Sequence, residues 1–168
     1  MSFAEFEQVI KAPALRKVAQ HWNEVRASKA IPDWNDIRPA CIAAQLSIIW
    51  AYRYDRSNDV LIGRLAGDQI EKVFGMTFRG TPMEVLYPSR EFPRMFNCFR
   101  RVVCEPALYI EDGKVFEAID HYGFGERIAM PLSSDGKQGD GIIGATVYDT
   151  IRINGVQLQR GDPRWFAL

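Results

Sequence analysis

The N-terminal part of the chain carries its apolar residues at helical spacing. Residues 3–28 place them three or four apart, which puts them on one face of a helix. Pro13 interrupts the run, so the pattern predicts a short helix followed by a longer amphipathic one that ends near Ser28. The apolar stripe of the longer helix consists of Leu15, Val18, Trp22 and Val25.

The spacing then changes to that of strands. Residues 47–54 and 60–66 are rich in β-branched and aromatic side chains, and the turn-forming residues 55–59 separate them. This pattern is typical of a β-hairpin. Both segments are apolar on both faces near their middles, which predicts a sheet that is covered on both sides.

Short helices are predicted between residues 68 and 105. Capping patterns begin at Asp68, Thr81 and Ser89, where a side chain can accept the free backbone N–H groups of the first helical turn. The last helix is the longest, and Pro106 ends it. Its apolar residues repeat at helical spacing: Phe92, Met95, Phe96, Phe99, Val102 and Val103.

Strand patterns return in the C-terminal half, at residues 107–111, 125–132 and 141–148. Asp112-Gly113 predicts a tight hairpin turn after the first of these, and Asn154-Gly155 predicts a further short hairpin near the C-terminus. Hairpins around a helical insert do not match the strand–helix alternation of a parallel sheet. We therefore predict an α+β fold, with an antiparallel sheet and helices across one face.

Composition narrows the function. The 168 residues include 21 basic and 21 acidic ones, and this length predicts one globular domain. A dedicated nucleic-acid binder would need a basic surplus, because phosphate neutralisation supplies much of its affinity. The longest apolar stretch is far shorter than a membrane span, and residues 1–10 lack the pattern of a signal peptide. We expect no nucleic-acid partner and no membrane.

Three cysteines, Cys41, Cys98 and Cys104, are an odd number without metal-ligand spacing. This usage predicts buried thiols in the reducing environment of the cytoplasm. The two histidines, His21 and His121, are also not spaced as a metal site, so we expect no bound metal.

The order of predicted elements resembles that of a PAS domain, and several short motifs resemble a family of bacterial single-domain PAS-like proteins typical of alphaproteobacteria. These motifs lie between Leu15 and Tyr148. They include Gly63-Arg64-Leu65-Ala66-Gly67 at a strand end, residues 75–81 before a short helix, and residues 126–133 and 142–145 in two late strands. The resemblance implies a PAS-like five-stranded antiparallel sheet, with short helices across one face and an N-terminal amphipathic helix.

The resemblance also implies a domain division and a function. Residues 1–46 would form an N-terminal helical flank, residues 47–148 the PAS-like core and residues 149–168 a C-terminal extension. The core would be a non-catalytic sensory or interaction domain that binds an unidentified small molecule in an apolar pocket. Its output would be protein–protein contacts with a separate signalling protein, or with a second copy of the chain through the N-terminal helix.

Candidate pocket residues come from one face of the first strand, from the helical insert and from the late strands. Arg64, Arg100 and Tyr52 are the polar ones that could converge on an anionic or carbonyl ligand, while a filled aromatic core is the alternative. The full set is Trp50, Tyr52, Arg64, Phe74, Met76, Phe96, Phe99, Arg100, His121 and Met130.

Common PAS cofactors are disfavoured. The long helix at residues 89–105 has no histidine for haem, and Asn97-Cys98-Phe99-Arg100 departs in order and position from the motif of flavin photosensors. The cofactor is therefore left unknown. An alternative function is a small cavity-containing enzyme or a carrier of lipid-like ligands, in which Asp120 and His121 would be the acid–base pair.

Overall fold

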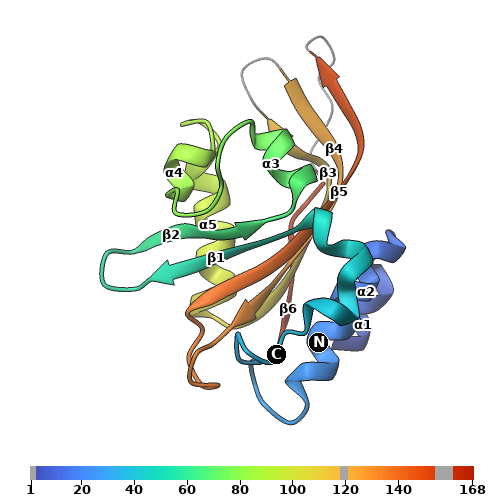
Figure 1. The fold of residues 1–168 in the computed structure, drawn as a ribbon, viewed down its shortest axis with the longest axis vertical. Helices are drawn as coiled ribbons and strands as arrows, with labels where there is room; N and C mark the ends of the chain where they lie inside the picture. Colours follow the sequence, from blue (N-terminus) through green and yellow to red (C-terminus); the bar gives the residue numbers. More distant parts are fainter. Residues whose placement is uncertain (1–2, 118–120, 154–160) are drawn as a thin grey trace.

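The computed structural model describes residues 3–117, 121–153 and 161–168, and at residues 121–122 and 150–153 it describes the backbone alone. In this part of the chain six strands form one antiparallel sheet, in the order β2-β1-β5-β4-β3-β6 (Figure 1). The strands are β1 (Ile49–Asp55), β2 (Val60–Ala66), β3 (Ala107–Glu117), β4 (His121–Leu132), β5 (Gly141–Ile153) and β6 (Arg164–Ala167).

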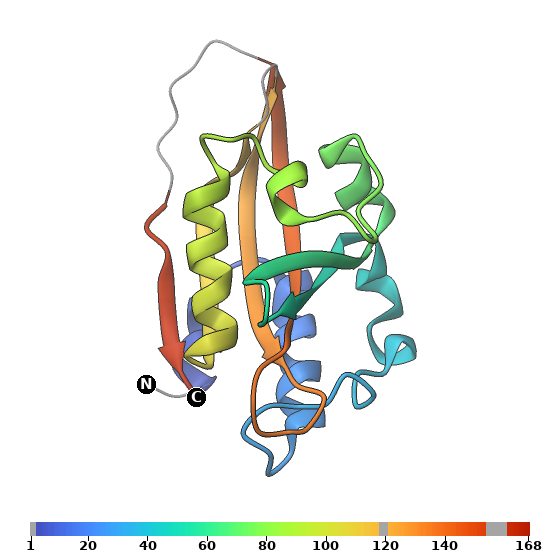
Figure 2. The same ribbon diagram turned by 90° about the vertical axis from the view of Figure 1, so that its left-hand side faces the viewer.

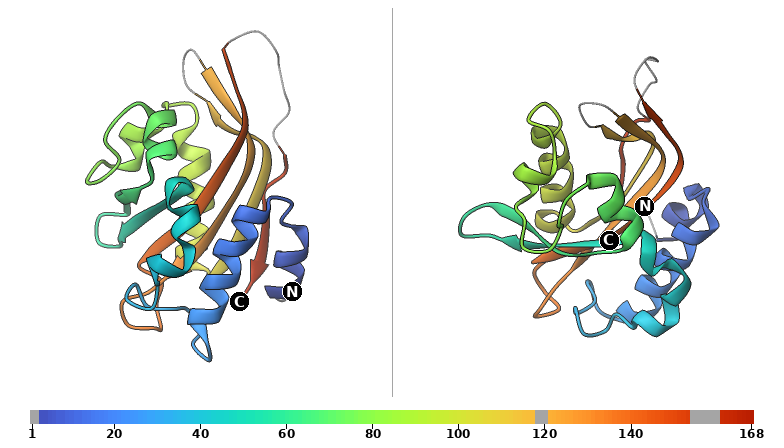
Figure 3. Two further views of the ribbon diagram at one scale, coloured as in Figure 1. Left: turned by 45° about the vertical axis from the view of Figure 1, so that its right-hand side comes forward. Right: turned by 45° about the horizontal axis from the view of Figure 1, so that its top comes forward.

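Helices cover both faces of this sheet. Figure 3 shows α1 and α2 on one face and α3, α4 and α5 on the other, and Figure 2 shows α5 running alongside the long strands. We call these the α2 face and the α5 face. The predicted α+β fold is confirmed. The helices are α1 (Phe3–Val9), α2 (Pro13–Arg26), the 3-10 helix η1 (Pro39–Ile48), α3 (Asp68–Phe74), α4 (Met83–Leu86) and α5 (Phe92–Cys104).

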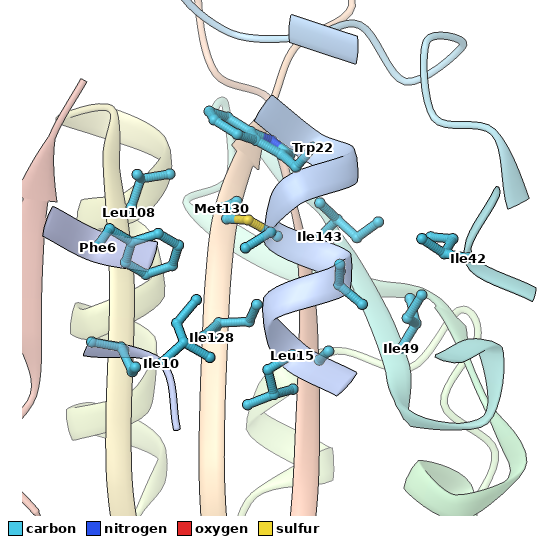
Figure 4. Packing of buried hydrophobic residues seen from close by; sticks show 14 of the residues in the cluster. Phe6, Ile10, Leu15, Trp22, Ile42, Ile49, Leu108, Ile128, Met130 and Ile143 are labelled. Carbon is cyan, nitrogen blue, oxygen red and sulfur yellow. The ribbon is translucent and has the colours of Figure 1, made fainter. Parts of the chain in front are cut away.

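The α2 face is an aliphatic core (Figure 4). Leu15, Val18 and Trp22 of α2 are almost fully buried there. The Trp22 Nε1–H donates to the Pro131 carbonyl oxygen at 2.9 Å, which fixes α2 to β4. The strands contribute Leu108, Ile110, Ile128, Met130 and Ile143. Three of the four residues of the apolar stripe of α2 are thus buried on the chain's own sheet, and Val25 is half-buried.

The α5 face carries a second core, which is aromatic. Trp50 and Tyr52 of β1 point to this face, because side chains alternate along a strand. Phe99 of α5 stacks on Trp50 with ring centroids 4.9 Å apart. Gly144 of β5 makes room for that ring, since a Cβ there would lie 2.2 Å from a Trp50 ring carbon.

Local sequence patterns correctly predicted the bounds of α3 and β2. The predicted helix at residues 68–74 is α3, and Gly75 ends it in the left-handed conformation with φ 69°. Its N–H donates to the Glu71 carbonyl oxygen at 2.8 Å, which satisfies an acceptor at the end of the helix. The predicted strand at residues 60–66 is β2.

The predicted turn at Asp112-Gly113 is wrong, because β3 continues through it to Glu117. Gly113 has φ 91° and pairs with Gly125 of β4. The Asp112 carboxylate contacts Lys11. The backbone carbonyl oxygen of Asp112 accepts the Gly161 N–H at 2.7 Å. Contacts distant in sequence therefore hold this dipeptide in the sheet.

The C-terminal hairpin also differs from the prediction. Asn154-Gly155 lies outside the described residues, but β6 pairs with β3 and not with β5. The Phe166 ring of β6 is buried 5.6 Å from the Phe6 ring of α1, which explains why this segment joins the edge of the sheet. A sixth strand thus extends the expected five. The helix η1 and the strand β5 each cross a predicted domain limit, the first at residue 46 and the second at residue 148.

The cysteines are free, but the expectation that all three are buried is wrong. Cys98 is buried in the aromatic core, Cys104 is half-buried and Cys41 is exposed on η1. Among the described residues, no helix is both long enough and apolar enough to cross a membrane.

Candidate functional site

A buried arginine lies in the α5 face. Arg127 of β4 is only 1% exposed. Its Nε–H donates to the Thr146 Oγ1 of β5 at 3.3 Å, and its Nη2 donates to the Val115 carbonyl oxygen of β3. The guanidinium carbon lies 6.0 Å from the centre of the Phe99 ring of α5. Three strands and one helix therefore fix the position of the guanidinium group.

One buried carboxylate faces this arginine. Glu111 of β3 is 0% exposed. Its Oε1 lies 2.8 Å from the Arg94 Nη2, and its Oε2 accepts the Tyr109 hydroxyl at 2.7 Å. The Arg127 Nη1 is farther away, 3.9 Å from Oε2. Within the described residues two arginines therefore share one carboxylate, and the closer contact belongs to Arg94.

Two tyrosine hydroxyls in the same core make no hydrogen bond of good geometry among the described residues, although that of Tyr52 lies near Tyr87 and that of Tyr148 lies near Arg127 and Thr146. They belong to Tyr52 of β1 and Tyr148 of β5, and both oxygens are buried. Burial raises the pKa of Tyr148 to about 12 and that of Tyr52 well above its ordinary value. Both hydroxyls therefore stay protonated and can donate. A buried polar group without a partner costs about 1–3 kcal/mol of stability, so such groups need an explanation.

Thr146 connects the buried Arg127 to the aromatic residue Trp50 through hydrogen bonds. Its Oγ1 accepts the Trp50 Nε1–H at 2.9 Å as well as the Arg127 Nε–H. The Tyr52 ring packs against Phe78, with centroids 4.9 Å apart, and against Phe99. We define the Arg127 cluster as Tyr52, Glu111, Arg127, Thr146 and Tyr148.

A narrow cleft opens at the rim of the α5 face. Its volume is about 50 Å³, and it lies between the start of β2, α4 and α5. Leu61 and Met83 line it and also belong to the buried core that contains Tyr52. The cleft thus places an opening at the edge of the same core.

The structure brings together only some of the residues that the sequence predicted for the pocket. Trp50, Tyr52 and Phe99 are buried in the α5 face, and Phe74 packs against them partly buried. Phe96 lies at the rim, where it lines the cleft. The side chain of His121, like all of Asp120, lies outside the described residues.

Four other predicted pocket residues point elsewhere. Met130 lies under α2, because the alternation of β4 places it on the face opposite Arg127. Arg64 is exposed and lies over the Trp34 ring at 4.0 Å. Arg100 is exposed, with its Nε 2.8 Å from the Asp59 carboxylate, and Met76 is 42% exposed. None of the three therefore faces the buried core.

Sequence reasoning missed Glu111, Arg127, Thr146 and Tyr148. One signal was present: Glu126 and Arg127 are adjacent charges in a strand predicted to be covered on both faces. Adjacent strand residues point to opposite faces, so each charge had to be buried on one face or the other. The pattern of this strand alone did not show which face of the sheet α3, α4 and α5 cover.

Glu126 serves the opposite face. It is 5% exposed, and its carboxylate accepts the backbone N–H of Lys11 at 2.9 Å and that of Ala12 at 2.7 Å. Ala12 precedes α2 and has no side chain that could cap it. The Glu126 carboxylate of β4 therefore caps the start of α2, and it holds the α1–α2 junction on β4.

A larger hollow of about 610 Å³ adjoins this junction and is lined by Lys11, Asp112, Gly125 and Asp149, among others. It is more open than the cleft, and its lysine already pairs with Asp112 at 2.5 Å. No cluster of metal-ligating side chains occurs in the part of the chain that the structure describes.

Buried polar atoms without a hydrogen bond occur on both sides of the sheet, since Nε of Arg26 on α2 is one of them. The hydroxyls of Tyr52 and Tyr148 and the Oε1 of Glu111 gather near Arg127, so we place the candidate site on the α5 face.

An antiparallel sheet with short helices over a face that buries polar groups defines a domain of the PAS class. A family model described as a PAS domain matches residues 10–147 of the 168-residue chain. No curated protein matches the chain. The match covers most of the sequence, from before α2 into β5, so the chain belongs to this PAS domain family.

Proposed function

We propose that the protein is a non-catalytic sensory domain that binds a small molecule at the Arg127 cluster and signals through protein–protein contacts. Domains of the PAS family are usually non-catalytic, and a sensory or interaction role is consistent with the family match. The observation that carries the proposal is the set of buried, unpartnered donors on the α5 face.

The unpartnered groups support a binding role over a purely structural core. Apolar side chains of the same size would fill the α5 face without the cost of desolvating an arginine and two hydroxyls. On the α2 face, by contrast, the Trp22 indole and the Glu126 carboxylate both have hydrogen-bond partners. A ligand that accepts hydrogen bonds would satisfy the hydroxyls and offset their cost.

The strand β4 supplies a path from ligand to output. Arg127 faces the ligand site, and its neighbour Glu126 holds the α1–α2 junction on the other face. A ligand that shifts β4 at Arg127 would change how firmly this junction is held. Such coupling requires that the ligand bind the two states with different affinity. The partner that binds at the α1–α2 junction is a second copy of the chain or a separate signalling protein in the cytoplasm.

The first test is native mass spectrometry of the protein purified gently from cells. We expect a retained small molecule, whose mass gives the ligand class, and its loss on mild denaturation. The control is the double variant Tyr52→Phe/Tyr148→Phe, which keeps both rings. The bare protein mass in both samples, together with no thermal stabilisation by any compound of a metabolite panel, would contradict the proposal. The domain would then be an interaction module with a filled core.

A further inference from the structure

We propose that the ligand of the Arg127 cluster is a small carboxylate, held by the Arg127 guanidinium and by the hydroxyls of Tyr52 and Tyr148. This inference rests on the proposed function and names its ligand class. It begins from Nη1 of Arg127, which has no oxygen acceptor at hydrogen-bond distance among the described residues.

The two other nitrogens of Arg127 have neutral oxygen acceptors in Thr146 and Val115. Nη1 has only the Met95 sulfur at 3.7 Å and the more distant Glu111 carboxylate at 3.9 Å, among the described residues. A thioether sulfur is a weak acceptor. The positive charge of Arg127 is therefore incompletely offset, and the N–H groups on Nη1 are the ones left for a ligand.

The charge balance favours an anion. Glu111 is already in contact with the Arg94 guanidinium at 2.8 Å and with the Tyr109 hydroxyl at 2.7 Å. A buried cation that lacks a close counter-charge is costly, and an anion next to it removes much of that cost. Arginine binds carboxylate groups especially well, because its planar N–H groups match the two oxygens.

The unpartnered hydroxyls point to the same chemistry. Tyr52, Tyr148 and the Nη1 of Arg127 all offer donors. Thr146 already accepts two hydrogen bonds, and the Glu111 Oε1, which makes no hydrogen bond among the described residues, lies 2.8 Å from the Arg94 guanidinium in an ion pair. A group that only accepts hydrogen bonds complements this set, and an ionised carboxylate is such a group. A neutral amide would bring no negative charge to offset that of Arg127, so it complements this set less well.

The packing limits the size of the ligand. The Trp50 and Phe99 rings stack at 4.9 Å and the Tyr52 and Phe99 rings lie 5.9 Å apart, so these side chains leave no room for a haem or a flavin between them. The rim cleft, which is lined by residues next to the Arg127 cluster and not by the cluster itself, has a volume of only about 50 Å³ and would admit only a small molecule. A carboxylate with a short carbon chain fits these limits, and its carbons would lie against the aromatic rings.

The test is thermal unfolding and calorimetric titration of the whole chain with formate, acetate and pyruvate. Acetamide is the neutral match for acetate, and sodium chloride controls for ionic strength. We expect at least one carboxylate to raise the melting temperature of the wild type in a saturable manner, and acetamide not to. The variants Tyr52→Phe and Tyr148→Phe should each weaken its binding about tenfold or more, as expected for a hydrogen bond to a charged group.

The same variants separate a binding role from a structural one. Neither hydroxyl makes a hydrogen bond of good geometry among the described residues, so the melting temperature of each unliganded variant should stay close to that of the wild type or exceed it. Arg100→Gln removes an arginine from the surface and should leave the affinity unchanged.

Three results would overturn the carboxylate assignment: no carboxylate stabilises the wild type, acetamide acts as well as acetate, or both tyrosine variants bind like the wild type. The proposed function survives these results if native mass spectrometry finds a neutral molecule that the double variant does not retain. Both fail if no molecule binds at all.

Discussion

The two faces of one sheet have different chemistry in this protein. Along β3 and β4, the residues that face α2 are aliphatic apart from Glu126, and the residues between them that face α5 include Tyr109, Glu111 and Arg127. On the α2 face the Trp22 and Glu126 polar atoms are paired. On the α5 face two hydroxyls are not. The period of two along the strands thus separates a face on which these polar groups are paired from a face that buries unpaired hydroxyls.

The most severe change we predict is Trp22→Ala on the α2 face. Trp22 is fully packed and donates to the Pro131 carbonyl oxygen. Its loss should lower the free energy of unfolding by about 3–5 kcal/mol, as for other buried aromatic residues. Urea denaturation measures this, with the half-buried Val25→Ala of the same helix as a milder control. A loss below about 1 kcal/mol would show that α2 does not stabilise the sheet as described.

Glu126→Gln should have a moderate effect at the α1–α2 junction. The amide keeps one acceptor oxygen and replaces the other by a donor, so one backbone N–H of Lys11 or Ala12 loses its partner. We expect a loss of about 1–2 kcal/mol, the range of a helix cap. Hydrogen exchange at these two amides should accelerate, while the exposed control Glu24→Gln leaves it unchanged. Unchanged exchange in both variants would refute the role of Glu126 as a cap.

A smaller effect is expected from His21 at acidic pH. His21 is buried, and its Nε2 accepts the Arg38 N–H at 3.0 Å. Burial lowers its pKa below the ordinary 6.5, against a weaker opposing effect of Glu24. The folded state therefore prefers neutral His21, so its contribution is constant above about pH 6.5 and is lost as the pH falls below that value.

Urea unfolding at about pH 7.5 and about pH 5.5 tests this. The variant His21→Gln can still accept the Arg38 N–H but does not titrate, so its stability should fall less between the two pH values. An equal fall in both proteins would assign the acid sensitivity to other groups.

The smallest effect is predicted for Arg100→Gln. Arg100 and Asp59 form an ion pair on the surface, where both are exposed to water. Such pairs contribute little to stability. The melting temperature and ligand binding should match those of the wild type. A loss of binding would restore Arg100 to the ligand site that its sequence position suggested.

The sequence allowed the fold to be predicted wherever a local signal decided the structure. The glycine at position 75 ends α3 as predicted, and the strand composition of residues 60–66 defines β2. The helix does begin at Asp68, but its N-cap residue is Gly67 and no side chain caps it, so the predicted cap at Asp68 is wrong. Asp112-Gly113 was wrongly predicted as a turn. Contacts with Lys11 and Gly161, which are distant in sequence, help to hold it within β3. The pairing of β6 with β3 is likewise a contact between distant segments, and no local pattern encodes it.

The site was harder to predict than the fold. Trp50, Tyr52 and Phe99 were found from their strand and helix periods, because the period alone assigns them to one face. Met130 and Arg64 were misplaced because the face that each strand presents to α5 depends on the register between strands. In the sequence, Arg127 is one charged residue among several. Its burial becomes evident only in the structure, where helices cover both faces of the sheet.

The most direct test of the two-face account is a crystal structure of the protein with its best-stabilising carboxylate. The account predicts density for the ligand between the Arg127 guanidinium and the hydroxyls of Tyr52 and Tyr148, within hydrogen-bond distance of all three. The α2 face should keep its packing around Trp22. A ligand bound instead in the hollow lined by Lys11 and Asp112, or water alone on the two hydroxyls, would contradict the assignment of binding to the α5 face.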